Sequence, residues 1–223
     1  MHSELSTINI APSSTHKYSV IWLHGLGADG HDFESIVPSL HLEAESNIHF
    51  IFPNAPIMPV TINNGMSMRA WFDILDITPE NHEVDIQGIY RSGELVHQLI
   101  EAERAKGILP QHIMLAGFSQ GGAIALHLGL RYADKLAGIM ALSTYMPTID
   151  KLGEEGSVTG KSTPIFMAHG ILDAIIAIEA GTKTFDKLSA MGYSIQWHDY
   201  LMEHSVCAEE MGHMSGFMNS IFV

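Results

Sequence analysis

Short continuous runs of apolar residues recur along the chain, and each is bounded by glycine, proline or polar residues. The runs are rich in β-branched and aromatic residues and too short for buried helices, so they predict strands that are covered on both faces. Six strands are expected, at 18–25, 48–53, 112–117, 136–143, 163–170 and 194–201.

The segments between these runs have helical spacing. One face of 85–106 carries apolar residues three, four and seven positions apart, namely Ile86, Ile89, Val96 and Ile100. Residues 120–132 are apolar on nearly all sides, which is typical of a helix buried against a sheet. Two further helices are expected at 178–191 and 205–218, and 53–84 is expected to be one long irregular stretch.

Strands that alternate with helices predict an α/β fold with a mostly parallel central sheet and helices on both faces. No repeat or linker interrupts the pattern, so residues 1–223 are expected to form a single domain without a separate lid domain. Binding sites in such sheets gather at the carboxyl ends of the strands.

Composition narrows the function classes. Eleven basic residues stand against 25 acidic ones, a net charge of −14, so nucleic acid is not an expected partner. No run approaches the ~18 apolar residues of a membrane span, and no secretory signal is visible at the N-terminus. Cys207 is the only cysteine, which excludes an intrachain disulfide and a cysteine metal cluster. The cytoplasm is the expected location.

The segment Gly117-Phe118-Ser119-Gln120-Gly121 matches G-x-S-x-G between a predicted strand and a predicted helix. In that context the motif is typical of a nucleophilic serine on a sharp turn. The alternative is that Ser119 only caps a helix and the glycines only permit close packing.

A serine nucleophile needs a carboxylate and a histidine, which in this fold follow the serine in that order. Asp173 comes directly after the strand at 163–170, whereas four other aspartates fall at the wrong end of a strand, within a strand or on helix and loop surfaces: Asp134, Asp150, Asp186 and Asp199. His204 follows the last strand, whereas His198 lies within that strand and His213 in the last helix. Asp173 and His204 are therefore the expected acid and base.

The glycine-rich segment at 22–33 follows the first predicted strand and can bring backbone N–H groups close to a substrate. The amides of Leu26 and Gln120 are the expected oxyanion donors. The segment has neither dinucleotide-binding nor P-loop spacing, so a phosphate site is not favoured.

Six ordered motifs together resemble the acyl-protein thioesterase/carboxylesterase family of small α/β hydrolases, also called the phospholipase/carboxylesterase family. They are HGLGADG (24–30), FPNAP (52–56), RAWFD (69–73), GFSQGG (117–122), HGILD (169–173) and MEHSV (202–206). The resemblance puts the family's triad on Ser119, Asp173 and His204, and its oxyanion donors on Leu26 and Gln120. One departure is Ile178, which stands where members commonly carry the proline of a Val-Pro pair.

The resemblance implies hydrolysis of carboxylic esters and thioesters, including S-acylated proteins and lysophospholipids, with no metal or organic cofactor. Small-molecule acyl esters or S-acylated proteins are thus the expected partners, and a homodimer is left open. A general short-chain carboxylesterase or a lysophospholipase would use the same catalytic residues, and a non-catalytic acyl-binding module is a second alternative.

An acyl chain needs an apolar groove that leads to Ser119. Methionine side chains adapt to chains of varying length. The expected groove residues are Met66, Met68, Trp71, Met146 and Met202. Residues 57–72 are further expected to form a mobile flap that contacts membrane lipid or acylated protein transiently.

Overall fold

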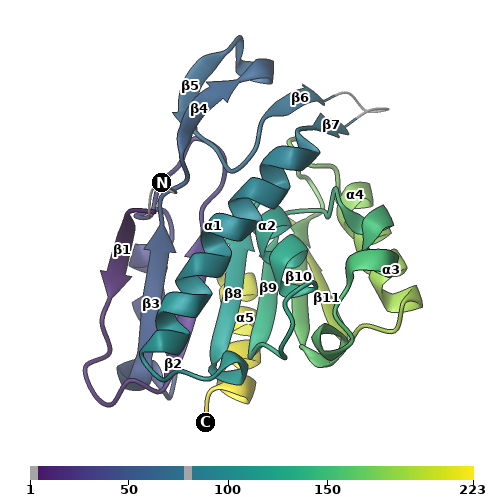
Figure 1. Ribbon diagram of the computed structural model, residues 1–223. Coiled ribbons are helices and arrows are strands. Elements are labelled where there is room, and N and C mark those ends of the chain that lie inside the picture. Colours follow the sequence, from purple (N-terminus) through teal and green to yellow (C-terminus); the bar gives the residue numbers. More distant parts are fainter. Residues whose placement is uncertain (1–4, 78–81) are drawn as a thin grey trace.

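A seven-stranded sheet forms the centre of the computed structural model, which describes residues 5–77 and 82–223 (Figure 1). Its strand order is β1-β3-β2-β8-β9-β10-β11. Within it β1 pairs antiparallel with β3, and all other pairs are parallel. The strands are β1 Thr7–Ile10, β2 Tyr18–Leu23, β3 Ile48–Pro53, β8 Ile113–Phe118, β9 Gly138–Leu142, β10 Ile165–Gly170 and β11 Ile195–Tyr200.

Helices cover both faces of this sheet, as the alternating pattern predicts. Helices α1 (Ile86–Ala105), α2 (Gln120–Gly129) and α4 (Ile178–Ala190) pack on one face, together with the short α3 (Leu152–Glu155). Helix α5 (Ala208–Ile221) and the 3-10 turn Glu34–Leu40 pack on the other. The predicted fold class is confirmed. No helix in the described ranges combines the length and the apolar character needed to cross a bilayer.

The six predicted strands all form, with bounds that differ by at most two residues. The prediction of helix 205–218 was wrong by three residues at each end. Cys207 is the N-cap of α5, and its Sγ accepts a hydrogen bond from the Glu210 amide at 3.5 Å. Strand β1 was not predicted, because its four residues gain order only by pairing with β3.

The stretch 53–84 is more regular than its composition indicates. It contains two small antiparallel pairs, β4 (Ile57–Val60) with β5 (Met66–Arg69) and β6 (Ile74–Ile77) with β7 (His82–Val84). Residues 78–81, close to the end of the expected irregular segment, lie outside the described residues. These two pairs stand above the carboxyl ends of the central strands (Figure 1).

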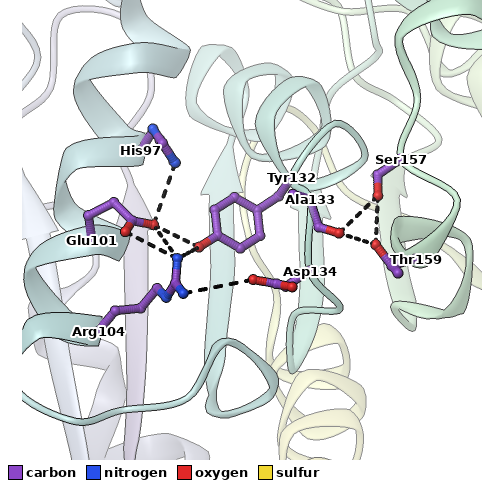
Figure 2. Close-up of polar contacts among 8 residues, drawn as sticks. All are labelled: His97, Glu101, Arg104, Tyr132, Ala133, Asp134, Ser157 and Thr159. Carbon is purple, nitrogen blue, oxygen red and sulfur yellow. Dashed lines mark hydrogen bonds and ion pairs between the residues drawn. The ribbon is translucent and has the colours of Figure 1, made fainter.

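A polar cluster ties α1 to the segment that follows α2 (Figure 2). The Glu101 carboxylate accepts hydrogen bonds from the Tyr132 hydroxyl at 2.8 Å and from Arg104 at 3.0 Å. Burial and the neighbouring Glu101 raise the pKa of Tyr132 to about 12, so the phenol stays protonated and donates. These hydrogen bonds hold the outer face of α1 to Tyr132, and the opposite face of the helix packs on the sheet.

Candidate active site

Ser119 occupies the turn between β8 and α2, with φ 54° and ψ −121°. A positive φ is strained for a residue with a side chain, at a cost of roughly 1–3 kcal/mol. Two hydrogen bonds hold the strained backbone. The Ser119 amide donates to Leu142 O at 2.9 Å, and the Thr144 hydroxyl donates to Ser119 O at 2.7 Å. A buried serine kept in this conformation is typical of a nucleophile elbow.

The two glycines of the motif are sterically required. A Cβ on Gly117 would lie 2.3 Å from the backbone of Gly121, and a Cβ on Gly121 would lie 2.3 Å from Leu23 O. No side chain fits at either distance, so α2 can start this close to β2 and β8 only with glycine at both positions. This disfavours the interpretation of Ser119 as an ordinary helix cap, and its side chain makes no capping hydrogen bond.

Asp173 and His204 meet above the ends of β10 and β11. The Asp173 Oδ2 atom lies 2.7 Å from His204 Nδ1, while Oδ1 accepts hydrogen bonds from the amides of Ile175 and Ile176 at 2.9 and 2.8 Å. The carboxylate is buried and accepts at both oxygens. His204 therefore carries its proton on Nδ1, which leaves Nε2 as the basic nitrogen.

A second histidine, His169, contacts Asp173 and its loop. Its Nε2 lies 2.8 Å from Ile176 O and 3.4 Å from Asp173 Oδ2, and the ring is fully buried. Burial lowers the pKa of His169, so the ring is neutral and its Nε2–H donates to the carbonyl. His169 thus helps to hold the loop that presents Asp173.

Ser119 and His204 line one cavity of about 350 Å³. No hydrogen bond joins the two side chains among the described residues, a separation that is common before substrate binds. The Phe118 and His204 rings lie 4.7 Å apart at their centroids, so the histidine packs directly beside the serine turn. Ser119 and His204 thus share one cavity, and Asp173 is joined to it through its hydrogen bond with His204.

The glycine-rich turn after β2 reaches the serine. A Cβ on Gly25 would lie 3.5 Å from Ser119 Cβ, and Leu26 and Gln120 both line the cavity. Neither the Leu26 nor the Gln120 backbone N–H has a hydrogen-bond acceptor within the described part of the chain. Two free amides next to a serine are the arrangement that an oxyanion hole requires.

His24 fixes the orientation of one of these amides. The Ala55 backbone N–H donates to His24 Nε2 at 3.0 Å, so Nδ1 must carry the proton, and it lies 2.7 Å from Gly25 O. Burial lowers the pKa of His24, which keeps the ring neutral. The carbonyl of Gly25 and the N–H of Leu26 belong to one planar trans peptide and point in opposite directions. Holding Gly25 O therefore aims the Leu26 N–H away from His24.

Trp71 supports the site rather than lining the cavity. Its Nε1–H donates to His24 O at 2.9 Å, and its backbone N–H donates to the Gln120 side-chain carbonyl at 3.0 Å. The Gln120 amide group in turn donates to Phe72 O at 2.8 Å. One short segment, 71–72, is thus bonded to the side chain of Gln120 and to His24, two residues before Leu26.

The structure does not place the five expected groove residues around the cavity. Within the described ranges, Trp71 and Met146 belong to the core on the α1 face, and Met202 to the core on the α5 face. Met66 is 65% exposed on the hairpin, and Met68 accepts a hydrogen bond from Asn63 at its sulfur. The expectation that methionines form the groove is corrected.

Branched and aromatic side chains line the cavity instead. They come from the turn between β4 and β5, the segment before β6, the β6–β7 pair and the acid loop: Ile62, Phe72, Ile74, Val84, Ile175 and Ile176. Asp32 is the one acidic side chain in this lining, and burial raises its pKa. The sequence signal for the first four was their place in 53–84, but no periodicity there indicated which residues face inward.

Comparisons with known proteins agree with this fold and identify the family. The profile of the phospholipase/carboxylesterase family matches residues 6–222. Acyl-protein thioesterase 1 of Neurospora crassa is 40% identical over 91% of this chain and 86% of that protein, and the Gibberella zeae protein of the same name is 36% identical over 96% and 97%. The structure resembles Arabidopsis thaliana SOBER1 with a TM-score of 0.88 at 31% identity, covering 93% of this chain and 100% of that one. It resembles Zea mays acyl-protein thioesterase 2 with a TM-score of 0.85 at 27% identity, covering 98% and 99%.

Proposed function

The chain belongs to the phospholipase/carboxylesterase family, and we propose that it hydrolyses esters and thioesters of acyl chains through Ser119, His204 and Asp173. The observation that carries the proposal is the meeting of three features at one apolar cavity. These are a strained serine, a histidine bonded to a buried carboxylate at 2.7 Å, and two free backbone amides. Each feature alone has another explanation, but a hydrolytic site needs all three.

In the acylation step, His204 Nε2 takes the hydroxyl proton of Ser119 as Oγ attacks the carbonyl carbon. Asp173 keeps the imidazole in the required tautomer and stabilises the imidazolium that forms. The tetrahedral intermediate then collapses, its bond to the alcohol or thiol breaks, and the imidazolium protonates the departing oxygen or sulfur. The acyl group remains on Ser119 as an ester.

In the deacylation step, His204 takes a proton from water, and the hydroxide attacks the acyl-enzyme. Collapse of the second intermediate releases the fatty acid and returns the proton to Ser119 Oγ. In both steps the carbonyl oxygen becomes negative beside the amides of Leu26 and Gln120. A single such donor is worth roughly 10²–10³ in kcat.

The cavity favours an acyl chain as the group that it holds. Its volume of about 350 Å³ falls within the ~300–1,000 Å³ typical of small-molecule sites, and its walls are mainly apolar. Relatives named acyl-protein thioesterase support S-acylated proteins as substrates. A short-chain carboxylesterase or a lysophospholipase is the alternative within the same chemistry.

Residues 57–72 are proposed to act as a mobile flap that meets lipid or an acylated protein. Ile57 and Met66, 68% and 65% exposed on the β4–β5 hairpin, support this proposal because they give the hairpin exposed apolar surface for such a contact. Hydrogen exchange tests it. Protection of this hairpin equal to that of β8 would contradict a mobile flap.

The serine assignment is tested with Ser119→Ala and with Ser205→Ala, an exposed serine beside His204, as the matched control. We expect Ser119→Ala to lose turnover of p-nitrophenyl esters and labelling by a fluorophosphonate, and Ser205→Ala to keep both. Turnover retained by Ser119→Ala would refute the assignment. Rates along a ladder of acyl chain lengths, on oxygen esters and thioesters, then separate a thioesterase for long chains from a short-chain carboxylesterase.

A further inference from the structure

Two histidines and a glutamate converge at the end of the sheet opposite Ser119. His16 precedes β2, His49 lies in β3, and Glu103 lies in the last turn of α1. The Glu103 side chain is only 2% exposed, while His49 and His16 are 13% and 23% exposed. Strands β2, β3 and β8 are parallel, so these residues sit at amino ends and the serine turn at a carboxyl end.

The backbone places these side chains together. Ser19 and His49 are direct neighbours in the β2–β3 register, and they share the sheet face on which α1 packs. On α1, Glu103 follows Val96 and Ile100 at helical spacing, so it occupies the next position of the apolar stripe. A carboxylate takes the place of a core residue there and meets two imidazoles.

The ligand atoms have separations that suit one metal ion. Glu103 Oε2 lies 3.1 Å from His49 Nδ1 and 3.3 Å from His16 Nε2, and all three atoms are within 4.8 Å of one another. Tetrahedral zinc, with bonds of about 2.0–2.2 Å to nitrogen and oxygen, holds neighbouring ligand atoms about 3.3 Å apart. Imidazole and carboxylate are also the non-thiol ligands that zinc prefers.

Polar groups occupy both oxygens of the Glu103 carboxylate, and a metal ion at Oε2 would share that atom with the Ser19 hydroxyl. Lys106 bonds Glu103 Oε1 at 2.5 Å, whereas Oε2 is the atom that both imidazoles approach. The Ser19 hydroxyl donates to Oε2 at 2.6 Å and lies 3.0 Å from His16 Nε2.

We propose that His16 Nε2, His49 Nδ1 and Glu103 Oε2 bind a zinc ion, with a water held by Ser19 as the fourth ligand. The ion would join three segments, namely the connection before β2, strand β3 and the end of α1. Because the site lies at the far end of the sheet from the serine turn, zinc stabilises the fold and takes no part in hydrolysis. The proposal is therefore independent of the proposed catalytic function.

Zinc alone is the probe, added to the full chain freed of metal, with binding followed by competition against a chromogenic chelator and by thermal unfolding. We expect a single zinc ion per chain and a rise in the unfolding temperature. His16→Ala should weaken zinc binding at least ~10-fold and shrink that rise. It is the preferred variant because Ser19, His49 and Lys106 still satisfy the buried carboxylate.

The matched control is His97→Ala on the outer face of α1, where His97 lies 3.5 Å from Glu101 (Figure 2). It also lies 3.8 Å from Glu94. This variant should bind zinc as the unaltered chain does. Lys106→Met should tighten binding severalfold, because it removes a positive charge from the same carboxylate. The proposal is overturned if the unaltered chain shows no saturable binding, or if His16→Ala and His97→Ala change it equally.

Discussion

Glu210 makes the stability of the protein depend on pH in a way that one substitution can isolate. The side chain is completely buried in the first turn of α5, and neither carboxyl oxygen makes a hydrogen bond of normal geometry with the described residues. Burial raises the pKa of Glu210 from 4.5 to about 8, and the backbone N–H of Cys207 opposes this only in part. The folded protein therefore keeps this proton at neutral pH.

The sign and size of the effect follow from proton linkage. The pKa is raised on folding, so the stability contribution is fully present below pH 4.5 and is lost as the pH rises toward about 8. In that window the free energy of unfolding falls by about 1.4 kcal/mol per pH unit because of this one group. Between pH 5.5 and 7.5 the loss amounts to about 2–3 kcal/mol.

Glu210→Gln removes the titration and keeps the size of the side chain. Urea unfolding followed by circular dichroism at pH 5.5, 6.5 and 7.5 gives the free energy of unfolding of both proteins. The difference, variant minus unaltered chain, should rise by about 2–3 kcal/mol across the series. The fourteen histidines titrate in both proteins and cancel, as does any constant cost of burying the amide.

Glu209→Gln, an exposed neighbour in the same turn, is the control and should give a difference independent of pH. If the Glu210→Gln difference is equally flat, the carboxyl is ionised or hydrated in the folded protein, and the reasoning from burial is refuted.

Three further predictions concern the backbone and the oxyanion loop. Ile178→Pro should raise the free energy of unfolding, measured in urea, by ~0.4–1 kcal/mol, since Ile178 is the first residue of α4 and Ala177 has the extended ψ of 137° that proline requires before it. A lower free energy of unfolding would contradict that geometry. Gly216→Ala, with open space around the new Cβ, should stabilise α5 by ~0.5–1 kcal/mol, whereas Gly121→Ala should unfold the protein or destabilise it severely. Equal thermal midpoints for the two variants would contradict the close approach of Gly121 to β2. His24→Ala should lower kcat at least ~10-fold with little change in KM, and His24→Asn, which can offer an N–H to Gly25, should recover part of the lost kcat. An unchanged kcat in the alanine variant would show that His24 does not position the oxyanion donor.

The sequence was sufficient for the central sheet because its strands are buried on both faces and therefore read as continuous apolar runs. It also placed Ser119, Asp173 and His204 at the carboxyl ends of β8, β10 and β11, since the motif and the parallel topology together leave few positions. The structure brings Ser119 and His204 to one cavity and bonds Asp173 to His204, and their catalytic roles stay a prediction for the variants above to test.

The rest depended on contacts that no local pattern encodes. Strands of three or four residues, such as β5 and β7, are set by their partners across the pair. Which face of such a strand points inward follows from its pairing register. Ile74 on β6 lines the cavity, whereas Met66 on β5 does not. The burial of Glu103 was visible only as a polar residue within the apolar stripe of α1, a signal that is easily read as the end of the stripe.

The pairing of β2 with β8 has a consequence for how the protein is made. These neighbours carry the glycine-rich turn and the serine turn, and Leu23 pairs with Gly117 across nearly half of the chain. The ribosome therefore delivers β2 long before β8 exists, and closing so large a loop is entropically slow. The last four strands, by contrast, follow one another in both sequence and space. We expect the catalytic elbow to form late, so that a nascent chain acquires no hydrolytic activity until most of its sheet is assembled.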